Sequence, residues 1–253
     1  MRIKWLGLFL LLMANCMSEI KAILFDCDGT LVDSEWAHYN GWKKALNDFG
    51  SDLSLEEYSP YVGKSAQVNA LLLAESKGIG LVELDRFLSI KTDYYRELCE
   101  AGVVPIAPTV AFLQKLVEEK HRLGLKIGVC SAARKEHILL HLKNLQIDHL
   151  LDVILSGQED LKDYSDPEGV NKPKPYIYQH AMKLLGVAPE ETVVIEDSAS
   201  GAWAGVMAGC FTIAVPNAYT KHHDFSHTHW QLDSFSELDV IDFFHHIRKR
   251  KCR

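Results

Sequence analysis

The sequence predicts an α/β protein in which a doubly wound parallel sheet is interrupted, after its first strand, by a block of helices. Two observations lead to this fold class. From residue 108 to residue 215, short apolar segments alternate with helical patterns, as in parallel sheets covered on both faces. From residue 34 to residue 102, amphipathic helical patterns follow one another without a convincing strand. The block leaves the sheet near Asp33 and Ser34 and returns near residues 103–106, so the two crossings form a natural hinge.

The first strand and the helical block follow from the apolar pattern between positions 21 and 100. Residues 21–25 form an apolar, β-prone run and are predicted as the first strand. Residues 35–49 carry aromatic and aliphatic side chains at helical spacing, and Asp33 and Ser34 are expected to cap that helix. Three further helices are predicted, with a break at Gly78-Ile79-Gly80. They cover residues 65–77, residues 81–87 with an expected continuation, and residues 89–100.

Strands and helices alternate in the second half of the chain. Three of the predicted helices end close to a glycine, at Gly124, Gly186 and Gly209. Crossovers of this length are right-handed, and ligands collect at the carboxyl ends of the strands. The predicted helices cover residues 108–123, 134–145, 175–185 and 199–208, and the strands cover residues 126–130, 153–155, 192–195 and 211–215.

The chain is expected to divide into a core, a cap and two terminal segments. Residues 1–17 are interpreted as dispensable or signal-like, because Arg2 and Lys4 precede an apolar run at residues 5–14. That run is too short to cross a bilayer in the usual way. A start of the chain at Met17 is the alternative interpretation. The remaining parts are the core (18–33 and 103–235), a helical cap (34–102) and a C-terminal helix with a basic tail (236–253).

Charge and cysteine usage argue against several classes of function. A net charge of −7 gives no field that would attract nucleic acid or an anionic membrane, so neither is expected as a partner. The basic tail at residues 248–251 is interpreted as a solvated terminus. Six cysteines are scattered without a CxxC pair, which favours reduced thiols and a cytoplasmic location. The sequence leaves the oligomeric state open.

Two aspartates stand directly after the first strand. Asp26 and Asp28 flank Cys27, and Gly29 then turns the chain. At positions i and i+2, where the strand ends, both carboxylates would face the crevice beyond it. Two neighbouring carboxylates repel each other and lose hydration, which costs stability unless a cation or a reaction uses them. The pair therefore indicates chemistry at this end of the sheet.

Polar side chains also follow the later strands. Ser131 follows the strand at residues 126–130, and Glu196 and Asp197 follow the strand at residues 192–195. Lys172 lies in a loop that leads into a helix. Carboxylate oxygens suit a hard cation such as Mg²⁺, while lysine and serine suit the oxygens of a phosphoryl group. The set predicts a magnesium-assisted phosphoryl-transfer site.

On these residues the chain resembles the haloacid dehalogenase superfamily, in particular its helical-cap sugar-phosphate and phosphoglycolate phosphatases and the β-phosphoglucomutases. The resemblance covers residues 20–220 and includes four motifs in the family's order. It implies a Rossmann-like core with an inserted α-helical cap. The motifs are Asp26-Cys27-Asp28-Gly29-Thr30, Ser131, Lys172 in Lys172-Pro173-Lys174-Pro175, and Glu196-Asp197-Ser198.

The resemblance also implies a mechanism. Asp26 attacks phosphorus and becomes an aspartyl phosphate, while Asp28 protonates the leaving group and then deprotonates water. Mg²⁺ would be held by Asp26, by the main-chain carbonyl of Asp28 and by Asp197, with Glu196 as a ligand or beside the ligands. The phosphoryl oxygens would be bound by Ser131, Ala132 and Lys172.

The cap is expected to select a small phosphorylated metabolite, in the first instance a sugar phosphate. His38 lies at the spacing where the sugar-phosphate members carry a histidine near the hinge, and Lys64 lies in Gly63-Lys64-Ser65, which resembles the cap loop that reaches into their site. The alternative for both is an ordinary residue on a helix surface or in a loop. A phosphosugar mutase is the nearest rival, although Thr30 and Leu31 follow the phosphatase form of the motif. A phospho-acceptor signalling domain is a rival of another class, but such domains are about half as long and lack a cap.

Overall fold

The core of the protein is a six-stranded sheet in which neighbouring strands run parallel. This computed structural model describes residues 19–62 and 66–251, so the predictions for residues 1–17 and for Lys64 lie outside the described residues. The strand order is β5-β4-β1-β6-β7-β8. The strands are β1 (Ala22–Phe25), β4 (Lys126–Ser131), β5 (Val153–Ser156), β6 (Thr192–Glu196), β7 (Phe211–Ala214) and β8 (Trp230–Gln231).

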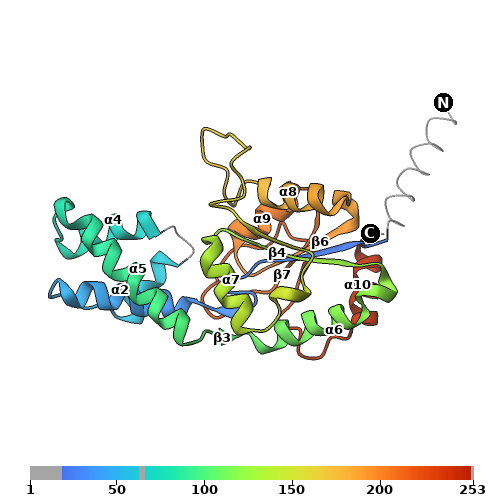
Figure 1. Cartoon of the computed structure of the whole chain (residues 1–253), viewed down its shortest axis with the longest axis horizontal. Coiled ribbons are helices and arrows are strands. Elements are labelled where there is room, and N and C mark those ends of the chain that lie inside the picture. Colours follow the sequence, from blue (N-terminus) through green and yellow to red (C-terminus); the bar gives the residue numbers. More distant parts are fainter. Residues whose placement is uncertain (1–18, 63–65, 252–253) are drawn as a thin grey trace.

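Helices cover both faces of this sheet, which confirms the predicted doubly wound α/β architecture (Figure 1). Side chains alternate along β1, so Ile23 and Phe25 enter one apolar core while Leu24 enters the other. Helices α6, α7 and α10 close the first core, and α8 and α9 close the second. Their bounds are α6 (Ala107–Leu123), α7 (Lys135–Asn144), α8 (Tyr176–Leu185), α9 (Ala199–Met207) and α10 (Val240–Lys251).

The predicted helical block follows the first strand and lies to one side of the sheet (Figure 1). It has an apolar core of its own, which contains Trp42, Leu73 and Phe87. An antiparallel ribbon joins it to the sheet, with Val32 paired to Pro105. The elements are β2 (Val32–Asp33), α2 (Glu35–Asp48), α3 (Leu55–Tyr58), η1 (Ser59–Tyr61), α4 (Ala66–Lys77), η2 (Leu81–Glu83), α5 (Leu84–Ala101) and β3 (Val104–Pro105).

Three local features differ from the sequence-based expectation. The helix expected to begin at residue 81 and run on beyond residue 87 joins the one expected at residues 89–100 in a single helix, α5, and residues Leu81–Glu83 before it form a 3₁₀ turn. No glycine or proline interrupts α5 before Gly102, which explains the continuity. The two-residue strands β2, β3 and β8 are too short to leave a periodic pattern. Ser34 occupies the N-cap position of α2, but its side chain makes no capping hydrogen bond.

The register of the sheet brings the ends of three neighbouring strands together. Phe25 of β1 lies between Val129 of β4 and Ile195 of β6. The backbone N–H of Asp26 donates to the carbonyl of Ile195 at 2.9 Å, so the pairing of β1 with β6 extends to Asp26. The polar residues that follow β1, β4 and β6 therefore meet at the carboxyl ends of these strands, as expected for a ligand site on a parallel sheet.

Candidate active site

The turn after β1 positions the two aspartates. The carbonyl of Cys27 accepts the backbone N–H of Leu31 at 2.8 Å, and the N–H of Gly29 donates to the carbonyl of Val32 at 2.8 Å. Gly29 has a φ of +85°, a conformation that glycine adopts without strain. Asp26 is only 6% exposed, whereas Asp28 is half-buried beside it. The turn thus leaves one carboxylate inside the site and one at its border.

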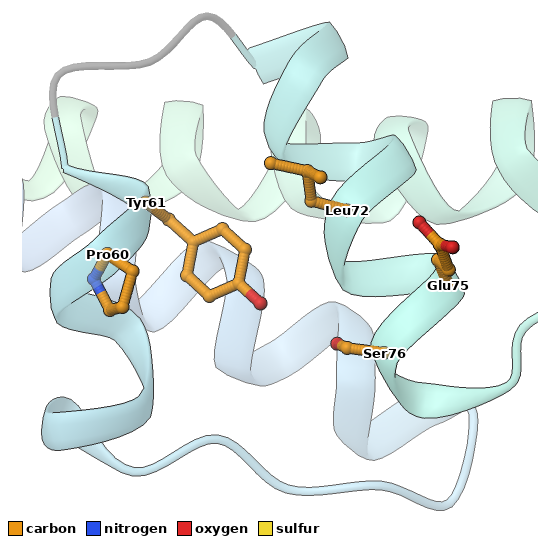
Figure 2. A pocket seen from close by; sticks show the side chains of 5 residues that line it. All are labelled: Pro60, Tyr61, Leu72, Glu75 and Ser76. Atoms are coloured by element: carbon orange, nitrogen blue, oxygen red, sulfur yellow. The ribbon is translucent and has the colours of Figure 1, made fainter.

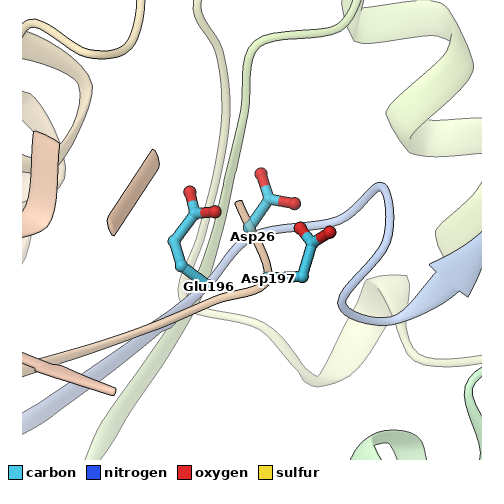
Figure 3. Close-up of side chains that lie close together, drawn as sticks. All are labelled: Asp26, Glu196 and Asp197. Atoms are coloured by element: carbon cyan, nitrogen blue, oxygen red, sulfur yellow. The ribbon is translucent and has the colours of Figure 1, made fainter. Parts of the chain in front are cut away.

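Three carboxylates gather at the carboxyl ends of β1 and β6. Asp26, Glu196 and Asp197 are all buried, and each offers a ligand atom within 4.8 Å of the others. Figure 3 shows the three side chains projecting to the same side of the chain segments that carry them. Such a group of oxygens fits the hard-cation site that the sequence predicts.

The cluster carries an electrostatic cost that a cation would relieve. Burial raises the pKa of the Asp26 carboxyl to about 8, and the carboxylates of Glu196 and Asp28 add to the effect, while Lys172 opposes it. Burial, together with the charges of Asp26 and Glu196, also raises the pKa of Asp197 well above its ordinary value. A divalent cation among these oxygens would favour their ionised forms.

Lys172 supplies one positive charge to the cluster. Its Nζ donates to Asp26 Oδ1 and to Glu196 Oε1, each at 2.6 Å, and to the carbonyl of Cys130 at 2.8 Å. Burial alone would lower the pKa of Lys172, but the two carboxylates outweigh it and raise the pKa above its ordinary value. Lys172 is therefore a buried, fully hydrogen-bonded ammonium that links the first and last acidic motifs.

Glu196 is held by more partners than the sequence suggests. Its Oε1 accepts a hydrogen bond from Tyr178 Oη at 2.7 Å in addition to that from Lys172, and its Oε2 accepts one from Ser198 Oγ at 3.1 Å. A Cβ at Gly201 would lie 1.9 Å from Oε1, so only glycine fits there. Sequence reasoning did not find Tyr178 or the role of Gly201, because both contacts depend on how α8 and α9 pack on the sheet.

The side chain of Asp28 lies apart from the three-acid cluster. Its Oδ1 accepts from Ser34 Oγ at 2.7 Å and lies 3.7 Å from His141 Nε2, and its Oδ2 accepts from Ser131 Oγ at 3.0 Å. These partners come from the start of α2 and from α7 and β4. Asp28 is thus anchored to both the helical block and the core.

Ser131 and Ala132 lie at the same edge of the sheet as the acids. Ser131 is buried, and its Oγ accepts the backbone N–H of Ala133 at 3.0 Å while donating to Asp28. Ala132 is exposed, and its carbonyl accepts from Gln158 Nε2 at 3.1 Å. The structure therefore brings Ser131 next to Asp28 and leaves Ala132 open to solvent beside it.

His38 lies in a buried cluster of the helical block. Its Nδ1 is 2.9 Å from Lys91 Nζ, and its ring stacks on Tyr95 with centroids 4.3 Å apart. Lys91 is only 3% exposed, and burial lowers its pKa to about 8. Burial and the charge of Lys91 lower the pKa of His38 well below its ordinary value. Sequence reasoning missed Lys91, although it interrupts the buried stripe of α5.

The described part of the chain also contains a separate pocket of about 370 Å³ within the helical block. Figure 2 shows that its lining comes from η1 and α4. None of the predicted catalytic or metal-binding residues contributes to it. The lining residues are Pro60, Tyr61, Leu72, Glu75 and Ser76.

Comparisons with known proteins agree with this geometry. The model of the haloacid dehalogenase-like hydrolases matches residues 23–215. Protein CbbY of Cereibacter sphaeroides is 31% identical over 231 residues, which cover 87% of this chain and 94% of that protein. The putative phosphatase YhcW of Bacillus subtilis is 27% identical over 231 residues, covering 91% of this chain and 99% of that protein.

A solved structure shares both the core and the helical block. It is CbbY from Rhodobacter sphaeroides in complex with xylulose-(1,5)bisphosphate, with a TM-score of 0.68 and 25% identity. The similarity covers 87% of this chain and 96% of that one. With the matched motifs in place at the edge of the sheet, the expected membership is confirmed: the chain belongs to the haloacid dehalogenase-like hydrolases.

Proposed function

We propose that the protein is a Mg²⁺-dependent phosphatase that hydrolyses a small phosphorylated metabolite through an aspartyl phosphate on Asp26. One observation carries the proposal. Asp26 is buried, and its Oδ1 lies 2.6 Å from Lys172 Nζ. One oxygen each of Asp26, Glu196 and Asp197 lies within 4.8 Å of the others, close enough to bind the same metal ion. A carboxylate in this setting has a cation on one side and a candidate metal site on the other, as an attacking group in phosphoryl transfer requires.

Two aspartates divide the chemistry in this proposal. Asp26 attacks phosphorus in line, and the leaving alkoxide takes a proton from Asp28. In the second half of the reaction Asp28 removes a proton from the water that hydrolyses the aspartyl phosphate. The half-buried position of Asp28, between Ser34 and Ser131, suits a group that must reach both the leaving group and water.

The acidic residues would hold the metal. Asp26 and Asp197 are proposed as carboxylate ligands and Asp28 as a ligand through its main-chain carbonyl. Glu196 is proposed to stand beside the ligands, because both of its oxygens already accept hydrogen bonds. When bound, Mg²⁺ supplies charge neutralisation for the transferring phosphoryl group.

Phosphate binding is assigned to Ser131, Ala132 and Lys172. The Lys172 ammonium would keep Glu196 and exchange one of its other two hydrogen bonds, to Asp26 or to the Cys130 carbonyl, for a phosphoryl oxygen. Its charge lowers the repulsion between Asp26 and the incoming anion. The Ser131 hydroxyl is already at the site, where it donates to Asp28. Ala132 is exposed directly after β4, and its carbonyl accepts a hydrogen bond from Gln158.

The helical block, proposed to span residues 34–102, would act as the cap that selects the substrate. It contributes half-buried His38 and buried Lys91, and the charge of Asp28 acts on Lys91. A cationic Lys91 suits an anionic or hydroxyl-rich substrate, and Lys64 remains a candidate from the sequence. The bisphosphate in the structure of the CbbY relative supports a sugar phosphate as the substrate class.

A cytoplasmic location is proposed from the state of the cysteines. Cys27, Cys99, Cys130 and Cys210 are buried and unpaired, which suits a reducing compartment such as the cytoplasm. In the described part of the chain, no helix is both long enough and apolar enough to pass through a bilayer.

Phosphate release from a panel of sugar phosphates and other metabolite esters, with and without Mg²⁺, tests the proposal. We expect release from at least one sugar phosphate, loss of release on chelation, and loss in an Asp26→Asn variant. Asp48→Asn, which removes an exposed carboxylate paired with Lys44, is the matched control and should retain activity. Conversion of β-glucose 1-phosphate to glucose 6-phosphate without phosphate release would instead indicate the phosphosugar mutase.

A further inference from the structure

A loop after β7 reaches the acid cluster through one amide side chain. Asn217 Nδ2 donates to Asp197 Oδ2 at 2.9 Å and to the carbonyl of Gly29 at 3.1 Å. These two acceptors belong to the last and the first acidic motifs, which are separated by more than 160 positions in the chain. A single NH₂ group therefore ties the turn after β1 to the end of β6.

The orientation of this amide is fixed by its other atoms. Asn217 Oδ1 accepts the backbone N–H groups of Tyr219 at 2.9 Å and Thr220 at 3.2 Å. The backbone N–H of Asn217 donates to Thr220 Oγ1 at 3.1 Å. Exchanging the amide oxygen and nitrogen would turn both pairs of contacts into repulsive ones. The Nδ2 group must therefore face Asp197.

The contact with Gly29 bears on a proposed metal ligand. The N–H of Gly29 is held by the carbonyl of Val32 at 2.8 Å, and its carbonyl is held by Asn217. Because a peptide unit is planar, the contact with Val32 fixes the carbonyl of Asp28, which shares a peptide with the Gly29 N–H, while Asn217 holds the next peptide, between Gly29 and Thr30. A Cβ at Gly29 would lie 2.4 Å from Asp197 Oδ2 and 2.9 Å from Asn217 Nδ2, so these three groups are in close contact.

The two carboxylate oxygens of Asp197 differ in the hydrogen bonds that they accept. Oδ2 receives Asn217 Nδ2 at 2.9 Å and Thr220 Oγ1 at 3.4 Å. Oδ1 has a long contact of 3.5 Å with Thr30 Oγ1. A neutral amide donor orients a carboxylate without cancelling its charge, so Oδ1 keeps its capacity as a ligand.

We propose that Asn217 is a positioning residue of the Mg²⁺ site, which orients Asp197 through Oδ2 and holds the turn after β1 at the Gly29 carbonyl, one peptide beyond the Asp28 carbonyl. The inference rests on the proposed function, because it concerns the same metal. It adds a fifth segment, the loop after β7, to the four motifs that build the site. Removal of groups that orient metal ligands commonly weakens metal binding by about 10- to 100-fold.

Calorimetric titration of the metal-free full-length protein with MgCl₂ tests the role directly, without any turnover. We expect Asn217→Ala to weaken Mg²⁺ binding by about 10- to 100-fold relative to the unsubstituted protein. Asn144→Ala is the matched control, since Asn144 Nδ2 donates to the carbonyl of Cys99, away from the acids. That variant should bind Mg²⁺ as the unsubstituted protein does.

The possible outcomes separate this inference from the proposed function. Should the folded Asn217→Ala variant bind Mg²⁺ with unchanged affinity, Asn217 has no positioning role and the proposed function stands. Absence of Mg²⁺ binding by the unsubstituted protein would overturn both. If Asn217→Ala does not fold, Thr220→Val decides, because it removes the hydroxyl that contacts both Asn217 and Asp197. A several-fold loss supports the inference, and unchanged affinity overturns it.

Discussion

Lys172 Nζ lies 2.6 Å from Asp26 Oδ1, and both side chains are more than nine-tenths buried. A buried carboxylate beside an ammonium is attracted to it strongly, but each group has lost its hydration. The pair is therefore sensitive to the removal of either partner. In this site the ammonium also contacts Glu196, so its loss would leave two carboxylates without their cation.

Replacement of Lys172 by methionine is expected to damage both activity and stability. The rate constant kcat should fall by about 10²- to 10³-fold, because a preorganised donor to the phosphoryl group is lost. The free energy of unfolding should fall by about 3–5 kcal/mol, because buried carboxylates lose their partner. Steady-state kinetics and urea unfolding measure the two effects. Lys174→Met is the matched control, since Lys174 pairs with exposed Glu168, and a loss of similar size there would argue against a specific role.

Asp28→Asn is expected to reduce the rate of hydrolysis by an amount that depends on the leaving group of the substrate. Loss of a general acid commonly costs about 10²- to 10⁴-fold in rate, and the cost is greatest where the leaving alkoxide is most basic. Hydrolysis of a sugar phosphate should therefore suffer more than hydrolysis of p-nitrophenyl phosphate. The measurement is kcat/KM for both substrates in both proteins. An equal loss for the two substrates would remove Asp28 from the role of the acid.

Lys91 predicts a particular dependence of stability on pH. Burial lowers its pKa in the folded protein to about 8 from the ordinary 10.5. Between these values the unfolded chain binds more protons at Lys91, so the free energy of unfolding should rise with pH. The cost of burying the charge is fully present below pH 8 and is relieved towards pH 10.5.

Urea unfolding at pH 7 and at pH 10 measures this effect by difference. Relative to Lys91→Met, the unsubstituted protein should gain about 2 kcal/mol of unfolding free energy between the two pH values. Lys115→Met removes an exposed lysine of α6 and should show no such difference. Parallel pH profiles for the unsubstituted protein and Lys91→Met would contradict the lowered pKa.

Gly201→Ala tests how tightly α9 packs on the acid cluster. The new Cβ would lie 1.9 Å from Glu196 Oε1, so the carboxylate or the helix must move. Overpacking of this kind typically costs about 1–3 kcal/mol of unfolding free energy. Thermal or urea unfolding gives the value, and Ser200→Ala at the neighbouring exposed position is the control. Unchanged stability of Gly201→Ala would mean that Glu196 is not held where the structure places it.

Most of the sheet and the reactive residues could be predicted from the sequence, for a physical reason. In a parallel sheet that is buried on both faces, the carboxyl ends of the apolar strands lie side by side, so the polar residues directly after these strands lie close together. The sequence alone therefore predicts that Asp26, Ser131 and Glu196 lie close together. Lys172 does not directly follow a strand but lies in a loop that leads into a helix, so its place at the site was predicted from the chemistry of the set and from the matched motif.

The remaining contacts depend on packing that leaves no local pattern. Tyr178 and Asn217 reach the site from α8 and from the loop after β7, and nothing in their neighbours indicates a polar target. The sequence predicts Ser34 as a helix cap, but the Ser34 hydroxyl instead donates a hydrogen bond to the nearby Asp28 carboxylate. Lys91 did leave a signal, because it stands between Phe87 and Tyr95 on the buried face of α5.

Chemical trapping of the phosphorylated enzyme during turnover tests the central claim most directly. Borohydride reduces an acyl phosphate, so quenching the reaction with it should convert Asp26 to homoserine in the presence of substrate and Mg²⁺. Mass spectrometry of the peptide containing residues 21–43 would locate the change. The account predicts modification at Asp26, dependent on both substrate and Mg²⁺. Steady turnover with an unmodified Asp26, or with modification at another carboxylate, would contradict it.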